Sequence, residues 1–182
     1  GQETRIDPSV SNIVDVYLLE RTYDNLFRIW LQDGGSKPDV STSDQLRINY
    51  SGALNPLKSL SDQIIYHPVK YKILFGSNAD EQLQATFKVV KNPKTNISDA
   101  VIKTRVIAAI NEFFALNNWD FGDSFYFTEL AAYIHNQLAP DLLTAVIVPN
   151  QSGQGFGSLF QVDSAADEIF ISGATVDDVS II

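Results

Sequence analysis

The sequence predicts an α+β fold with mixed, mainly antiparallel sheets and a few packed helices. Segments in which apolar and polar residues alternate, as in strands, are interspersed with segments whose apolar residues recur at helical spacing. Their order does not follow a strict strand–helix–strand rhythm, which argues against a doubly wound parallel sheet. The 182 residues, of which 45% are hydrophobic, suffice for one substantial domain or two small ones.

Residues 1–45 are expected to form a strand–helix sub-domain and a linker, either by themselves or as part of a preceding domain. Residues 12–20 are rich in Val, Ile, Leu and Tyr, which predicts a buried strand. A helix with Thr22 as its N-cap and Gly34 at its end should follow. Its apolar stripe consists of Tyr23, Leu26, Phe27, Trp30 and Leu31. The polar stretch 33–45 predicts the linker.

Residues 46–182 are expected to form an α+β assembly domain. Residues 69–75 and 83–91 each alternate apolar and polar side chains, and a polar loop joins them. This pattern predicts an antiparallel hairpin. Residues 46–68 give no secure assignment beyond a bend at Pro68.

Two helices and several short strands are predicted in the rest of this domain. Ser98 is a good N-cap for a helix whose buried positions recur at helical spacing. These positions are Ile102, Val106, Ile110 and Phe113. A second helix should begin at Thr128 as its N-cap, carry Glu129 in its first turn and end before Pro140. Strands are expected at DSFYF, LLTAVIVP, GSLFQV and EIFIS.

The charge of the chain is unevenly distributed. All 13 basic residues lie in the first 105 residues, and ten acids but no Lys or Arg follow from Val106 onward. Such an acidic half repels phosphate, so we expect no nucleic-acid binding there. The acids either maintain solubility or form a surface that meets a basic partner.

Several residue types and segments are missing from the sequence. It has no cysteine, so disulfides and thiolate chemistry are excluded and nothing indicates an oxidising compartment. No apolar run approaches the roughly 20 residues that span a bilayer, and the first residues do not resemble a signal peptide. We therefore expect cytoplasmic synthesis and no membrane segment. The lack of methionine suggests a fragment of a longer protein.

The stretch NNWDFGDSFYFTELAAYIHNQLAP, residues 117–140, poses the central functional question. Asp120, Asp123 and Glu129 are candidates for the paired carboxylates of a carbohydrate-active or other hydrolytic enzyme. The alternative is that Gly122 supplies a turn that the acids solvate. The Asp-Phe-Gly triplet resembles that of protein kinases, but the chain lacks their Gly-rich and His-Arg-Asp loops. We favour the structural interpretation.

Other catalytic and binding motifs give no support for a chemical site. The two histidines, His67 and His135, do not cluster with acids, and no acid lies three or four positions from His135. The Gly-rich residues 153–160 lead into a predicted strand rather than a helix, which argues against a phosphate cradle. No Gly-x-Ser-x-Gly motif occurs. The sequence therefore predicts no catalytic, metal-binding or cofactor-binding residue and no enzymatic activity.

Apolar residues in the acidic tail, residues 156–182, are the candidate interface. They are Phe156, Phe160, Phe170, Ile171, Ile181 and Ile182. Most of these tail residues are expected to complete sheets within the chain. The remainder would pair with another chain by strand addition.

Five strings in this order resemble a known family. They are LKSLSDQIIYHP, AAINEFFA, WDFGDSFYFTELAAYIHNQLAP, AVIVP and FGSLFQVDSAADEIFISGATVDDVSII. Together they resemble the C-terminal part of the baseplate wedge proteins of T-even-like contractile-tailed bacteriophages, in the baseplate J-like group. The resemblance is strongest over residues 107–182 and extends back to about residue 57.

The resemblance implies a structural role in the virion. Wedge proteins of this family associate with themselves and with other wedge subunits, and the wedges join into a ring around the tail hub. We therefore expect a homodimer that also binds other baseplate wedge proteins, made in the host cytoplasm and located in the tail baseplate. The resemblance implies no enzymatic activity and no cofactor.

Overall fold

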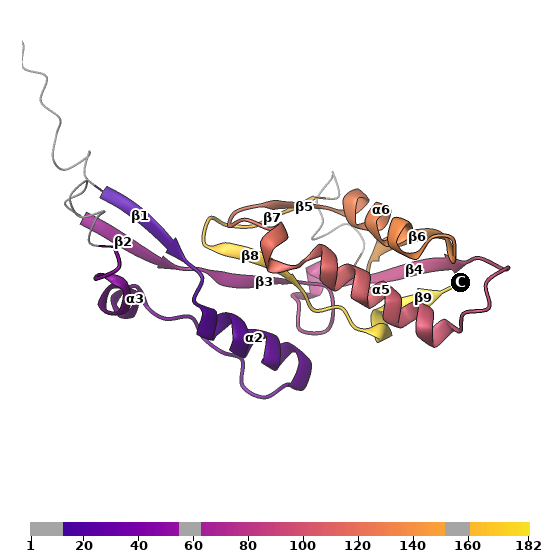
Figure 1. The fold of residues 1–182 in the computed structure, drawn as a ribbon, viewed down its shortest axis with the longest axis horizontal. Helices are drawn as coiled ribbons and strands as arrows, with labels where there is room; N and C mark the ends of the chain where they lie inside the picture. Colours follow the sequence, from indigo (N-terminus) through magenta and orange to yellow (C-terminus); the bar gives the residue numbers. More distant parts are fainter. Residues whose placement is uncertain (1–12, 55–62, 152–160) are drawn as a thin grey trace, which may run out of the picture. The chain divides into compact units, whose positions relative to one another are not determined.

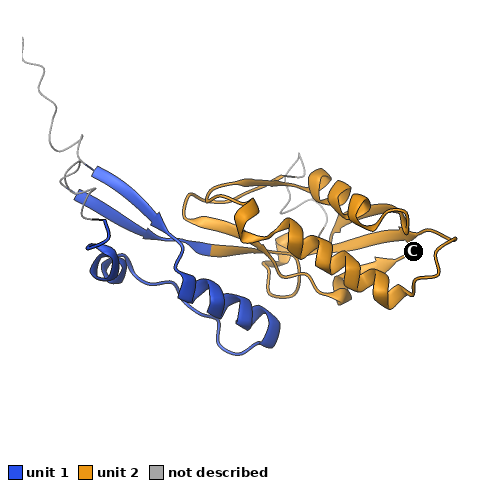
Figure 2. Cartoon of the chain, in the orientation of Figure 1, with its two compact units in different colours: residues 1–70 blue, residues 71–182 orange. Residues whose placement is uncertain are grey.

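A computed structural model of the chain describes residues 13–54, 63–151 and 161–182. In these residues four α-helices accompany short strands in small mixed and antiparallel sheets, which confirms the α+β class (Figure 1). The chain divides into two compact units, residues 1–70 and 71–182 (Figure 2). The division between these units falls after Lys70, and the strand just before Lys70 pairs with the first described strand; the domain boundary expected at residue 45 stays a prediction.

The first unit contains two strands and two helices. They are β1 (Ile13–Leu18), α2 (Arg21–Asp33), α3 (Ser43–Tyr50) and β2 (Gln63–Pro68). β1 and β2 pair in parallel, with Ile13 opposite Gln63 and Leu18 opposite Pro68. The strand predicted at residues 12–20 is therefore present, but the prediction that it is buried is wrong, since its residues are exposed or half-buried.

The two helices of this unit differ from the predicted pattern. α2 begins at Arg21, so Glu20 rather than Thr22 is its N-cap, and it ends as predicted at Gly34, whose φ is 78°. α3 begins within the predicted linker and was not expected. A capping box starts it, in which Thr42 Oγ1 accepts from the Gln45 N–H and Gln45 Oε1 accepts from the Thr42 N–H.

The second unit contains the remaining described elements. Its strands are β3 (Lys70–Leu74), β4 (Ala85–Lys91), β5 (Ser124–Tyr126), β6 (Leu142–Pro149), β7 (Gln161–Asp163), β8 (Glu168–Ser172) and β9 (Val179–Ile181). Its α-helices are α5 (Asp99–Phe113) and α6 (Phe127–Leu138). Three short 3₁₀ turns accompany them, η1 (Glu81–Leu83), η2 (Leu116–Asn118) and η3 (Val176–Asp178).

The strand pairing differs from the predicted hairpin of residues 69–75 and 83–91. β4 is the centre of a three-stranded sheet, antiparallel to β6 and parallel to β9, whereas β3 pairs with β8. β5 and β7 form an antiparallel pair. The predicted hairpin is wrong because an alternating pattern identifies strands but does not identify their partners. Both strands instead pair with segments from the C-terminal part of the chain.

A close approach of two glycines fixes the chain where β3 ends. Phe75 has a φ of 65° although its ring is fully buried, and the φ of Gly76 is 79°. A Cβ atom on Gly76 would lie 1.9 Å from the carbonyl oxygen of Gly173, just after β8. Only glycine fits at position 76, since both the backbone conformation and the space exclude a side chain.

The core of the second unit is a cluster of phenylalanine rings. Its buried members are Phe75, Phe87, Phe114, Phe125, Phe127 and Phe170. Phe125 is in contact with the rings of Phe75, Phe114 and Phe127 at centroid distances of 5.3–5.8 Å. Such tilted and edge-to-face contacts are favourable for aromatic rings. The cluster joins strands and helices from most of this unit.

The two long helices of the second unit pack against each other, and α6 also packs against β6. α5 begins as predicted after Ser98, whose Oγ accepts from the Val101 N–H. α6 begins at Phe127, so the predicted N-cap at Thr128 is wrong; the buried ring of Phe127 already belongs to the helix. No helix within the described residues combines the length and the apolar character needed to cross a membrane.

Candidate functional site

The predicted interface residues of the tail have different environments in the structure. Phe170 and Ile171 on β8 are buried, and Ile181 on β9 is half-buried. Ile182 follows β9 and is 72% exposed. Phe156 and Phe160 lie outside the described residues.

The last strands of the chain complete sheets inside the second unit. Val179 lies opposite the buried Phe87, and the Ile182 N–H donates to the Val89 carbonyl over 2.9 Å. β8 pairs with β3 in the same unit. Of the four described candidates, only the Ile182 side chain therefore remains fully available to a partner.

The strand predicted at LLTAVIVP is an outer strand and presents apolar side chains to solvent. β6 lies at one edge of the three-stranded sheet, where Leu143 is 53% and Val146 is 51% exposed. Val146 lies opposite Lys88, on the face of the sheet away from Phe87. A continuous apolar run is typical of a strand buried on both faces, so the pattern of LLTAVIVP gave no indication of this exposure.

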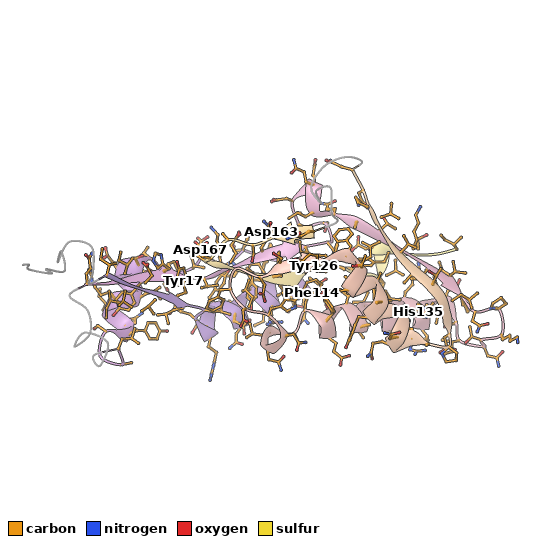
Figure 3. All side chains as sticks on the ribbon, turned by 90° about the horizontal axis from the view of Figure 1, so that it is seen from above. Tyr17, Phe114, Tyr126, His135, Asp163 and Asp167 are labelled. Atoms are coloured by element: carbon orange, nitrogen blue, oxygen red, sulfur yellow. The ribbon has the colours of Figure 1, made fainter. Side chains whose placement is uncertain are left out.

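Residues 113–133 surround an open depression of about 500 Å³. The aromatic side chains in its wall are Phe113, Trp119, Tyr126 and Tyr133, and Asp123 and Glu129 supply carboxylates. α5, η2, β5 and α6 thus contribute to one surface. Figure 3 labels Tyr126 on β5 and His135 further along α6.

The aromatic wall is held in place by packing and by one hydrogen bond. Trp119 stacks on Phe114 with a centroid distance of 5.3 Å and an interplanar angle of 12°. Its indole Nε1–H donates to the Phe113 carbonyl over 2.9 Å. Phe113 contacts the ring of Tyr133 at 5.5 Å. These contacts restrict the rotamers of three of the four rings in the wall.

The three candidate catalytic carboxylates have unequal roles. Asp123 Oδ2 accepts a hydrogen bond of 2.7 Å from the Asp120 N–H, so this carboxylate closes the turn at Gly122. Gly122 has a φ of 77°, and its N–H donates to the Glu168 carbonyl. The predicted turn is therefore present. Asp120 does not line the depression, whereas Asp123 and Glu129 do.

Hydrogen bonds across β5 and β7 stabilise one side of the depression. Ser124 Oγ donates to Asp163 Oδ1 over 2.6 Å, and the Gln161 side-chain amide donates to the same oxygen. These donors, with a smaller contribution from the charge of Lys72, lower the pKa of Asp163. On the other side, burial followed by the hydrogen bond with Glu112 raises the pKa of Tyr133.

The two histidines lie in different units and away from the depression. His67 Nε2 lies 2.8 Å from Asp15 Oδ1, and its ring stacks on Tyr17 across β1 and β2. His135 is in the last turn of α6. Within residues 13–54, 63–151 and 161–182, no three histidine, aspartate or glutamate side chains group together as metal ligands.

Comparison with known proteins adds no relative: no family model and no curated protein matches the chain.

Proposed function

We propose that the chain is an assembly module of a phage tail baseplate wedge, which associates with a second copy of itself and with other wedge proteins. The strings that resemble the C-terminal part of T-even-like wedge proteins support this role. They include residues of the buried core, such as Phe125, Phe127 and Phe170, and of the wall of the depression.

The exposed apolar side chains of β6 are the observation that carries the proposal. Leu143 and Val146 place apolar surface beside the outer backbone edge of this strand. An edge strand of this kind is a template for pairing with another chain, since its outward N–H and C=O groups have no partner strand among the described residues. Strand addition along β6 would bury both side chains.

We therefore place the main interface on β6, at the edge of its sheet opposite β9. β9, the other outer strand, has few residues, and Ile182 is the exposed apolar side chain beside it. We assign β9 and Ile182 a secondary role in self-association. Deletion of residues 170–182 would remove the buried Phe170, Ile171 and Val179, so it would test folding rather than association.

Solution mass is the direct test. Light scattering of the 20.2-kDa chain should give about twice the monomer mass at high concentration, and a double variant, Leu143→Glu with Val146→Glu, should give the monomer mass. The added charges would have to be desolvated in the paired edge. Val101→Glu, a change of the same kind at an exposed position on α5, is the matched control and should remain dimeric.

The result that contradicts self-association is a monomeric mass for the intact chain, or an unchanged dimer in the double variant. Circular dichroism of the double variant and of the Val101→Glu control should match that of the intact chain, which separates a lost interface from a lost fold.

The depression at residues 113–133 supports a hydrolytic function as the second candidate. Asp123 and Glu129 line the same surface, as a carboxylate pair requires. The Asp123 carboxylate is already engaged in the turn, which weakens its suitability as a base. Glu129→Gln should leave association intact, and the hydrolytic candidate requires it to abolish cleavage of a polysaccharide substrate.

A further inference from the structure

The depression at residues 113–133 combines two groups that attract cations. Phe113, Trp119, Tyr126 and Tyr133 present aromatic rings, whose faces carry negative electrostatic potential. Asp123 and Glu129 add carboxylates. A cation over an aromatic face gains about 0.5–1 kcal/mol at an exposed site and more when it is desolvated.

None of the described residues that line this depression is a lysine or an arginine. No Lys or Arg follows Arg105, and the ion pairs among the described residues do not include Asp123 or Glu129. Lys72 reaches the neighbouring strand β7, but its Nζ donates to the backbone carbonyl of Asp163 over 3.1 Å. The charge of these two carboxylates is therefore not compensated within the described part of the second unit.

We propose that this depression binds an arginine or lysine side chain presented by a partner protein. An arginine side chain fits best, since its planar guanidinium can stack on Trp119 or Tyr126 while its N–H groups pair with Glu129. Asp123 contributes mainly its charge, because one of its oxygens already accepts from the Asp120 N–H. The volume of about 500 Å³ exceeds one side chain, so flanking residues of the partner also enter.

The first unit contains a contact of the same kind, between a cation and a tryptophan ring. In the first unit Lys37 Nζ lies 5.6 Å from the ring centroid of Trp30. Trp119 is the other tryptophan of the chain, and its environment holds two carboxylates but no cation of the described residues. The packing of Trp119 on Phe114 means that little side-chain entropy remains to be lost when a cation binds.

A neutral sugar is the alternative ligand for an aromatic surface. Sugars stack on exposed rings and hydrogen-bond to carboxylates, but they do not neutralise charge. The uncompensated charge of two carboxylates favours a cationic ligand. This inference extends the proposed function, since the basic side chain would belong to a neighbouring wedge subunit.

The test is an NMR titration of the full chain that follows the indole N–H signals of both tryptophans. The probe is the capped tripeptide Gly-Arg-Gly, and its counterpart with citrulline in place of arginine has the same shape without the charge. The arginine probe should shift the Trp119 signal saturably, with a Kd on the order of 1 mM. The citrulline probe should not, and Trp30 serves as an internal reference. Added salt should weaken binding, because the contact is exposed.

Two variants should each raise the Kd of the arginine probe by about two- to fivefold: Glu129→Gln removes a charge, and Tyr126→Ala removes a ring that is 39% exposed. Asp177→Asn is the matched control, since it removes an exposed charge on η3 that does not line the depression. Equal shifts with citrulline, no saturable shift with arginine, or stronger binding of a neutral oligosaccharide such as cellohexaose would overturn the proposal. Light scattering of Glu129→Gln separates this result from the proposed function, because self-association through β6 should persist.

Discussion

The two compact units bury their apolar residues to different extents. The second unit encloses a cluster of six phenylalanine rings between its sheets and helices, whereas the first unit buries Tyr23, Phe27, Leu46, Tyr66 and Val69. Both units leave large apolar side chains exposed, and those of the first unit lie on β1, α2 and α3. They are Ile13, Tyr17, Leu26, Ile29 and Ile48.

This difference indicates how each unit obtains its stability. A two-stranded sheet is at best marginally stable in water, and parallel sheets are usually covered on both faces. The first unit is built on such a sheet. Its two helices, α2 and α3, both lie between β1 and β2 in the chain. We therefore expect the second unit to be the more stable of the two, with the first unit dependent on a few buried residues.

The largest effect is expected from Phe125→Ala in the second unit. Phe125 is fully buried and is in contact with the rings of Phe75, Phe114 and Phe127. Removing its ring should lower the free energy of unfolding of this unit by about 3–5 kcal/mol. Urea unfolding followed at Trp119 measures the loss. Phe121→Ala, at an exposed ring four residues earlier, should change the same quantity by less than about 0.5 kcal/mol. Equal losses in both variants would contradict the assigned core.

A somewhat smaller loss of stability, confined to the first unit, is expected from Leu46→Ala. Leu46 is the buried residue of α3, and truncating it should cost about 2–5 kcal/mol. The indole signal of Trp30 should report unfolding at lower urea concentration, while that of Trp119 stays unchanged. Ile48→Ala on the same helix is the control, because Ile48 is 75% exposed. Simultaneous early unfolding at both tryptophans would show that the two units are not independent.

The smallest effect on stability is expected when the pH is lowered, and it concerns the second unit. The hydrogen bond from Arg105 to Asp141, followed by that from Thr95, lowers the pKa of Asp141. The folded state then binds a proton less readily than the unfolded state. This interaction stabilises the unit above the ordinary Asp value of 3.8, and its contribution is lost as the pH falls through the lowered pKa.

Asp141→Asn should therefore reduce stability near neutral pH and flatten its decline in acid. Thermal unfolding at a series of pH values measures both changes, and Asp177→Asn, at an exposed position on η3, should leave the profile unaltered. An unchanged acid profile in Asp141→Asn would show that the Arg105 contact does not contribute.

Some elements could be predicted from the sequence because their signals are local. The N-cap at Ser98, the end of α2 at Gly34 and the turn at Gly122 each have a signal in the neighbouring residues. α3 was missed because the Gly-, Ser- and Pro-bearing stretch 33–45 predicted a linker, although the capping box of Thr42 and Gln45 was a usable signal. The N-caps of α2 and α6 were each misplaced by two residues, because the residues at these positions, Glu20 and Tyr126, make no capping hydrogen bond with their side chains.

The candidate site illustrates the same limit. The acids and rings of residues 113–133 were visible as an acidic, aromatic stretch, but their arrangement in one depression depends on the packing of α5, β5 and α6. The exposure of Leu143 and Val146 could not be inferred either, since it depends on β6 being an outer strand.

The sequence by itself determined the α+β class, most helix and strand positions, and the separation of the basic residues from the acidic half. Periodicity, caps and charge are properties of adjacent residues, so they can be read directly. Only the tertiary structure decided that β4 pairs with β6 and β9, that β3 pairs with β8, and which apolar side chains remain exposed. Strand pairing joins distant segments, and the free energy that selects among alternative partners comes from burial of the whole core rather than from any single segment.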